Sequence, residues 1–95
     1  GAKRMNKESP YLPHYWNNEL FEHWQALESE VSDAIGLTIQ LNTDSSLAKD
    51  WIEDFNNDGS YASYNLKWLL VYHFQEHGID GLLKDYPEIE TIGVK

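Results

Sequence analysis

The stretch Ser60–His77, SYASYNLKWLLVYHFQEH, carries apolar residues on almost every side of a helix drawn through it. These apolar residues are Tyr61, Tyr64, Leu66, Trp68, Leu69, Leu70, Val71, Tyr72 and Phe74. A helix that is apolar nearly all round is either buried centrally or half-buried with the remainder in an interface. The sequence therefore predicts a helix over 60–77 around which the rest of the chain packs.

Two groups of side chains lie on different sides of this predicted helix. One group is aromatic and the other mixes leucine with histidine: Tyr61, Tyr64, Trp68 and Tyr72 against Leu66, Leu70, His73 and His77. The two imidazoles indicate that the second side is nearer to water, since histidine is less often fully buried than leucine. We therefore expect the Trp68 side to form the core and Leu66 and Leu70 to be partly buried.

Three further helices are predicted, two before this segment and one after it. Apolar residues recur at three- and four-residue spacing over 17–35, at Leu20, Trp24, Leu27, Val31 and Ile35. A second stripe over 45–57 contains Leu47, Trp51 and Phe55, and a short helix over 80–86 ends before Pro87. The sequence thus predicts a mainly α, compact four-helix domain with helices over 17–35, 45–57, 60–77 and 80–86.

Two short segments read as strands. Leu37–Leu41 alternates apolar and polar residues with period two, which is typical of a half-buried strand. The plausible partner is 89–94, which is rich in isoleucine, threonine and valine. Because a two-stranded pair is marginal alone, the pair of 37–41 and 89–94 would have to lie on the helices.

The N-terminal part is divided at Pro10. Residues 1–9 are polar and are expected to form a disordered tail, with Gly1–Arg4 a cloning remnant ahead of Met5. Residues 10–95 are expected to form one helical domain. Within it, 10–16 contains two prolines and three aromatic residues, which favours an extended strap packed on the domain; the alternative is a partner-binding arm.

Composition excludes several classes of protein. The chain of 95 residues has room for one core, and it has no cysteine for disulfides or thiolate metal sites. No apolar run approaches the roughly 18 residues of a membrane span. We therefore expect a cytoplasmic protein with no membrane association.

The charge is strongly negative and unevenly distributed. The chain has 16 Asp and Glu against 7 Lys and Arg, and between Glu19 and Asp58 there are ten carboxylates and one base, Lys49. Such a surface repels nucleic acid and attracts basic partners, although it can also serve only to keep a small protein in solution. The candidate partner-binding residues are Glu19, Glu22, Glu30, Asp33, Asp50 and Glu53.

The segment 54–60, DFNNDGS, resembles the calcium loop of EF-hand and dockerin modules. The resemblance would make oxygen ligands of Asp54, Asn56 and Asp58, with Gly59 at the sharp turn. The twelfth position of the Asp54–Asn65 loop departs from the motif, because Asn65 stands where a bidentate glutamate is expected. The alternative is an ordinary polar turn between two helices.

The segment His73–His77, HFQEH, is similar to the zinc motif of inverted zincin peptidases, and this similarity is confined to five residues. Only 18 residues follow His77 to supply a third ligand. His77 also comes directly before Gly78, where an imidazole complements the C-terminal end of a helix. The second interpretation is favoured, so we expect no enzyme, no cofactor and no resident metal.

These observations favour a small acidic, non-enzymatic protein that binds and inhibits a basic partner such as a nucleic-acid-binding protein. Phage-encoded inhibitors, antitoxins and immunity proteins are similar in size and charge. A homo-oligomeric interaction domain using the apolar helix is the first alternative, so the protein is expected to be a monomer or a homodimer. A weak calcium-binding helix-loop-helix module is the second.

Overall fold

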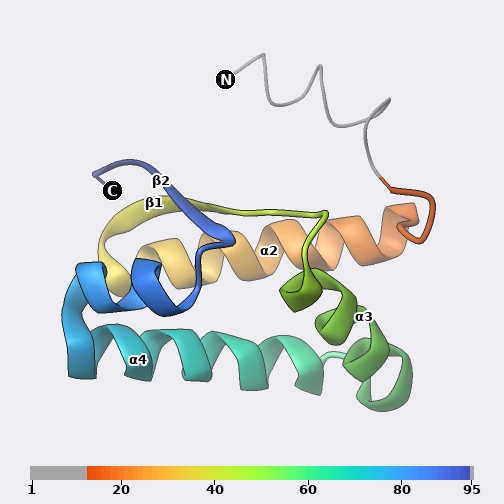
Figure 1. The fold of residues 1–95 in the computed structure, drawn as a ribbon. Helices are drawn as coiled ribbons and strands as arrows, with labels where there is room; N and C mark the ends of the chain where they lie inside the picture. The colour runs from red at the N-terminus through yellow and green to blue at the C-terminus, as the bar shows by residue number, and fades with distance from the viewer. Residues whose placement is uncertain (1–12, 95) are drawn as a thin grey trace.

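A computed structural model of the chain describes residues 13–94 (Figure 1). Its elements follow in the order α2 (Asn18–Ile35), β1 (Leu37–Leu41), α3 (Ser46–Asp58), α4 (Tyr61–Asp85) and β2 (Ile89–Val94). The expected tail over 1–9 and the first three residues of the expected strap lie outside the described residues. The mainly helical class and the short pair of strands are both confirmed, and the two strands are antiparallel.

The predicted count of four helices is not matched, because the described chain contains three. The segments 60–77 and 80–86 are parts of one element, α4, which bends at Gly78 (φ 75°, ψ −178°). Glycine reaches this backbone conformation without a clash between a Cβ and the main chain. Beyond this non-helical residue, the last two turns of α4 run back toward the body of the protein (Figure 1).

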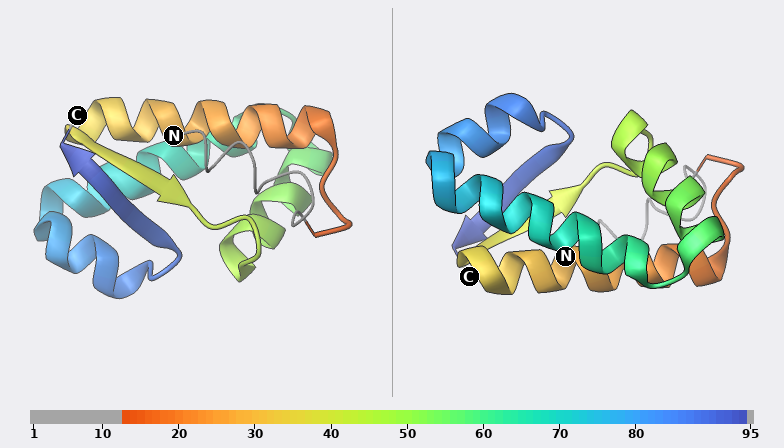
Figure 2. Two further views of the ribbon diagram at one scale, coloured as in Figure 1. Left: turned by 90° about the horizontal axis from the view of Figure 1, so that it is seen from above. Right: turned by 90° about the horizontal axis from the view of Figure 1, so that it is seen from below.

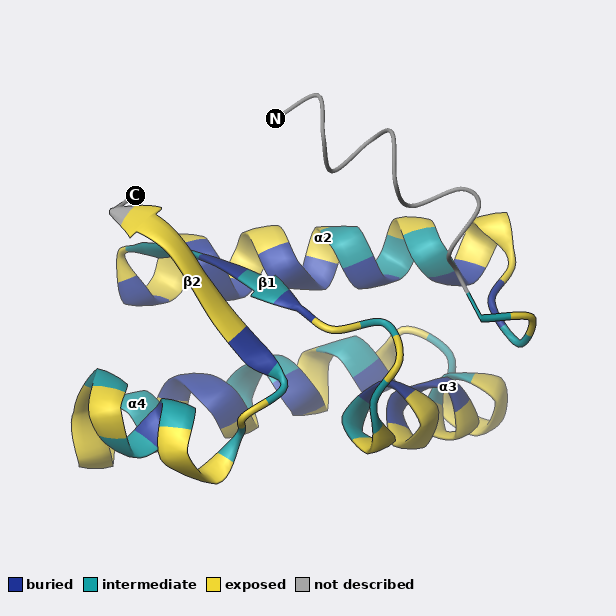
Figure 3. Ribbon diagram, turned by 45° about the horizontal axis from the view of Figure 1, so that its top comes forward, coloured by how far each residue is buried: buried dark blue, intermediate teal, exposed yellow. Residues whose placement is uncertain are grey.

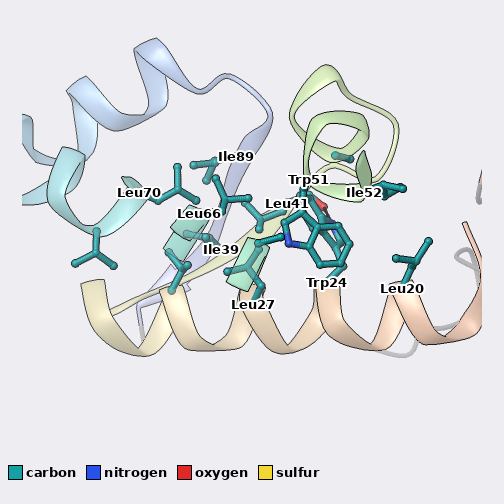
Figure 4. Packing of buried hydrophobic residues seen from close by; sticks show 14 of the residues in the cluster. Leu20, Trp24, Leu27, Ile39, Leu41, Trp51, Ile52, Leu66, Leu70 and Ile89 are labelled. Carbon is teal, nitrogen blue, oxygen red and sulfur yellow. Dashed lines mark hydrogen bonds between the residues drawn. The ribbon is translucent and has the colours of Figure 1, made fainter. Parts of the chain in front are cut away.

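The elements enclose one core between two long helices and the sheet. α2 and α4 run side by side, and β1 packs along α2 with β2 beside it (Figures 1 and 2). α3 packs against the first half of α4. Leu27 of α2, Ile39 of β1 and Leu70 of α4 point into the space between these elements and are almost inaccessible to water (Figure 4).

α2 begins and ends at the residues that its sequence indicates. The side chain of Asn17 accepts a hydrogen bond of 2.8 Å from the N–H of Leu20, and Gly36 closes the helix in the left-handed conformation (φ 78°). All five residues of the predicted apolar stripe are buried: Leu20, Trp24, Leu27, Val31 and Ile35.

The two strands pair at the predicted residues. β1 and β2 are antiparallel, with Leu37 opposite Val94 and Leu41 opposite Ile89, and the register is irregular between Thr38 and Ile39. Ile89 is buried, whereas residues 90–93 are exposed, so most of β2 lies on the surface (Figure 3).

The edge of β1 that faces away from β2 is covered by side chains of α2. The N–H of Ile39 donates to Ser32 Oγ at 3.0 Å, and the N–H of Leu41 donates to Glu28 Oε2 at 2.7 Å. Trp24 Nε1 in turn donates to the carbonyl of Leu41 at 3.2 Å. Because residues four apart share a helix face, Trp24, Glu28 and Ser32 form one polar row that satisfies an edge strand.

The prediction of which side of α4 forms the core is wrong. Leu66 and Leu70 are buried, at 8% and 0% exposure, whereas Tyr61 is 72% exposed and Trp68 is half-buried. Leu66 and Leu70 belong to one buried cluster with residues of α2 and α3, and the exposure of the tyrosines leaves the aromatic side outward. His73 also lies on the leucine side, where its Nε2 is 2.9 Å from Oδ2 of Asp85, a residue beyond the bend. The two groups are close enough for an ion pair, but they are not aligned as a hydrogen bond.

The described part of the strap, 13–16, packs on the domain. Trp16 is buried and stacks on Trp51, with ring centroids 6.1 Å apart, and its Nε1 donates to the carbonyl of Thr43 at 2.8 Å. Tyr15 donates to Asp44 Oδ1 at 3.2 Å. Burial, and then the hydrogen bond and charge of Asp44, raise the pKa of the Tyr15 phenol above its ordinary value, so it stays protonated and continues to donate.

Candidate protein-binding surface

The outward side of α4 carries four aromatic residues in one row: Tyr61, Tyr64, Trp68 and Tyr72. Tyr61, Tyr64 and Tyr72 are 72%, 58% and 58% exposed. Three of the rings are in contact, because the Tyr64 and Trp68 centroids are 6.2 Å apart and those of Trp68 and Tyr72 are 5.3 Å apart. We call these four residues the aromatic row. Contiguous exposed apolar surface of this kind marks interaction sites on small proteins.

Viewed from below, α4 lies in front of the rest of the described chain, and no other element crosses its outward side (Figure 2). α2 runs along one side of α4 and α3 lies along the other. The faces of these two helices therefore flank the aromatic row.

On the α2 side, the row meets a cation and a carboxylate. Lys67 Nζ lies 5.4 Å from the Trp68 ring centroid and 3.5 Å from Glu30 Oε1. An ammonium group in this position is attracted both by the ring face and by the carboxylate. The Trp68 indole thus already holds a cation within the protein, next to the acidic side of α2.

On the α3 side, the row meets a groove of about 230 Å³ between α3 and α4. Trp51 and Leu66 form its buried floor, and Leu69, which is 52% exposed, forms one wall. Asp50 and Asp54 line the opposite wall and are exposed. Within residues 13–94, neither of these two carboxylates makes an ion pair. We call this feature the α3–α4 groove.

The structure places the predicted partner-binding carboxylates on two separate helices. All six of these predicted residues are exposed. Four lie on α2 and two on α3: Glu19, Glu22, Glu30 and Asp33, and Asp50 and Glu53. Glu30 contacts Lys67 and so adjoins the aromatic row, whereas Asp50 lies at the groove on the other side of that row.

Sequence reasoning missed the aromatic row and the groove as candidate sites, because it assigned the Trp68 side to the core. The spacing of Tyr61, Tyr64, Trp68 and Tyr72 was visible in the sequence. The spacing does not say which side of the helix faces outward. The three tyrosines are a weak signal for the outward side, since a phenol hydroxyl can reach water from a ring that packs on the surface.

The candidate calcium ligands do not lie in a loop. Asp54, Asn56 and Asp58 belong to the last turns of α3, which ends at Asp58, and only Gly59 and Ser60 separate α3 from α4. In a helix, Asn56 projects away from the side shared by Asp54 and Asp58, so the three oxygens diverge. Across residues 13–94, no three histidine or carboxylate groups are arranged to hold a metal ion.

His73 and His77 lie close together near the end of the first part of α4. Their ring centroids are 4.6 Å apart, and the His73 ring also contacts Tyr86 at 5.3 Å. With Asp85 2.9 Å from His73 Nε2, this cluster ties the two parts of α4 together across Gly78. Its geometry is that of a structural contact.

Comparison with protein-family models, with curated proteins and with solved structures found no match to this chain. None of the helices in the described residues is both long enough and apolar enough to cross a lipid bilayer. The surface of the described residues combines exposed aromatic rings, a small groove with an apolar floor and many carboxylates.

Proposed function

We propose that this protein is a small, acidic, non-enzymatic binding protein that captures a basic protein partner and inhibits it. The observation that carries the proposal is the charge of the folded surface. Residues 13–94 contain fifteen carboxylates and three lysines, and the carboxylates proposed for binding are exposed on α2 and α3. One of the three lysines, Lys67, is already engaged by Glu30.

A surface of this sign favours association with a positively charged partner. Complementary charge accelerates the encounter of two proteins and excludes partners of the same sign. A nucleic-acid-binding protein presents such a basic surface for phosphates, and an acidic protein bound there would block access to the nucleic acid. Inhibition by occupying a basic surface requires no catalytic group.

The test begins with capture from a lysate of the source organism on the immobilised protein, at about 50 mM and then about 500 mM NaCl. We expect basic proteins to be retained at low salt and released at high salt. A captured protein should lose nucleic-acid binding when this protein is added. The double variant Glu22→Lys and Asp33→Lys should slow association about tenfold or more.

Glu90→Lys is the matched control, since Glu90 is exposed on β2, away from the acidic helices. It should slow association much less for each charge reversed. Capture that is indifferent both to salt and to the reversals at Glu22 and Asp33 would mean that the carboxylates only keep the protein in solution, and the proposal would be abandoned.

Self-association is a second candidate function, favoured by one specific observation, the exposure of the aromatic row on α4. Sedimentation velocity over a range of concentrations distinguishes the two. A dimer that dissociates in the Tyr64→Ala variant would favour this second candidate, whereas a monomer at all concentrations favours the first.

A further inference from the structure

We infer that the α3–α4 groove and the aromatic row together form the docking site for a basic segment of the partner, with an arginine side chain seated in the groove. This inference rests on the proposed function, and it names both the site and the chemistry of the group that the site accepts. It does not follow from net charge alone, because it places recognition on α3 and α4 and not on the most acidic side of α2.

The groove matches the two ends of an arginine side chain. Its floor and one wall are apolar, formed by Trp51, Leu66 and Leu69, and suit the aliphatic stem. Asp50 and Asp54 on the opposite wall are four residues apart and so lie on one side of α3, about 5–6 Å between Cβ atoms. A guanidinium group carries five donors in a planar fork and can bind two neighbouring carboxylates at once.

The aromatic row supplies the second part of the site. Aromatic rings attract guanidinium and ammonium groups through their faces, and arginine also stacks on them. The contact of Lys67 with Trp68 shows that a ring of this row accepts a cation. From Tyr61 to Tyr72 the row extends about 16 Å along the helix at the usual rise per residue. That length accommodates about five residues of an extended segment, at roughly 3.3 Å each.

A basic segment fits this surface better than a second copy of the chain. Aromatic side chains carry about 150–250 Å² each, so Leu69 and the three exposed tyrosines offer about 500 Å². A stable dimer buries about 800 Å² from each partner. A second copy would also bring its own Asp50 and Asp54 toward the same carboxylates, and the repulsion would oppose contact. Nucleic acid is disfavoured for the same electrostatic reason.

The test uses a fluorescein-labelled peptide of nine arginines as the probe, with fluorescence anisotropy at about 150 mM NaCl. The double variant Asp50→Asn and Asp54→Asn should weaken binding at least tenfold. The control Glu22→Gln and Asp33→Asn removes the same charge from α2 and should weaken binding less than threefold. All four positions are exposed, so a single cooperative thermal transition in each variant, recorded at the salt concentration of the binding assay, should confirm that the variants fold.

Two further measurements test the apolar part of the site. Leu69→Ala and Tyr64→Ala should each lower the affinity for the arginine peptide by about threefold to tenfold, because each removes an exposed group that the bound segment would cover. A peptide of nine lysines should bind several-fold more weakly than the arginine peptide, since an ammonium group cannot stack on the rings or bridge two carboxylates in a plane. Equal affinity for the two peptides contradicts the site.

The remaining outcomes separate this inference from the proposed function. Equal weakening by the two charge-neutralising pairs would mean that the acidic surface attracts basic peptides without the groove, which overturns the inference and retains the proposed function. Failure of the arginine peptide to bind the unmodified protein even at about 50 mM NaCl would overturn both. A concentration-dependent dimer that Tyr64→Ala dissociates would assign the aromatic row to a second copy and overturn the inference.

Discussion

Glu28 is a buried carboxylate on α2, a helix whose other carboxylates are exposed. It is 4% exposed, and its Oε2 accepts the N–H of Leu41, which lies on the edge of β1 that β2 does not cover. In the sequence it is one more acidic residue on an acidic helix. Its burial depends on how β1 returns along α2 after Gly36, and no local pattern in the sequence specifies that return.

Replacing Glu28 should therefore lower the free energy of unfolding more than replacing an exposed carboxylate of α2 does. Glu28→Ala leaves the Leu41 N–H without this acceptor and should lower the free energy of unfolding by about 1–3 kcal/mol. Glu28→Gln keeps an oxygen acceptor and should cost less. Urea denaturation measures both, with Glu22→Ala as the exposed control, expected within about 0.5 kcal/mol of the unmodified protein. A Glu28→Ala protein as stable as this control would show that the hydrogen bond contributes nothing.

At the scale of elements, the sequence predicts those whose apolar residues follow a single period. α2 has one stripe at three- and four-residue spacing, and the β1–β2 pair has alternating or β-branched residues, so both are found at the predicted positions. α4 has apolar residues at nearly every angle, so periodicity predicts a helix without indicating which side is inside. That choice is made by α2 and α3, which pack on Leu66 and Leu70.

Two adjacent leucines of α4 test this orientation directly. Leu70 is 0% exposed and Leu69 is 52% exposed, although the residues are neighbours of the same type. Leu70→Ala should lower the free energy of unfolding by about 2–5 kcal/mol because it leaves a cavity in the core. Leu69→Ala should change it by no more than about 0.5 kcal/mol. Thermal melts of the two variants decide the matter, and a reversed order would return the Trp68 side to the core.

The bend of α4 depends on Gly78. Its backbone (φ 75°, ψ −178°) lies in a region that side-chain-bearing residues almost never occupy, although a Cβ there would meet no atom within 4 Å. Gly78→Ala should thus destabilise the protein by about 1–3 kcal/mol through backbone strain alone. Gly36→Asn is the control, since asparagine tolerates the left-handed conformation of Gly36. If both variants melt at the same temperature, α4 can bend without a glycine.

At the scale of the whole molecule, the predictable features are those that depend on composition. Net charge and the small size of the core follow from counting residues, and Trp16, Trp24 and Trp51 supply a large share of the core of this short chain. The candidate site depends on how distant segments meet. The α3–α4 groove needs Asp54 and Leu69 on facing helices, and the DFNNDGS segment fits the end of a helix as well as it fits a loop.

Self-repulsion of the carboxylates gives the last prediction. The described domain measures about 34 × 33 × 20 Å, and the screening length is about 30 Å at 0.01 M salt and roughly 6 Å at 0.3 M. At low salt, carboxylates on α2 and α3 therefore repel one another across the molecule and destabilise the compact state. The melting temperature at pH 7.5 should rise by several degrees between about 10 mM and 300 mM NaCl, where 1 kcal/mol corresponds to about 4–8 °C.

The variant carrying Glu22→Gln and Glu53→Gln should melt higher than the unmodified protein at low salt, and its melting temperature should rise less as salt is added, since two of the repelling charges are gone. Sucrose, which strengthens burial without screening charge, separates screening from a general solvent effect and should raise both proteins equally. A melting temperature that falls with NaCl would mean that attractive pairs such as Lys67 with Glu30 outweigh the repulsion. In that case the acidic surface would be less available to a basic partner than its net charge implies.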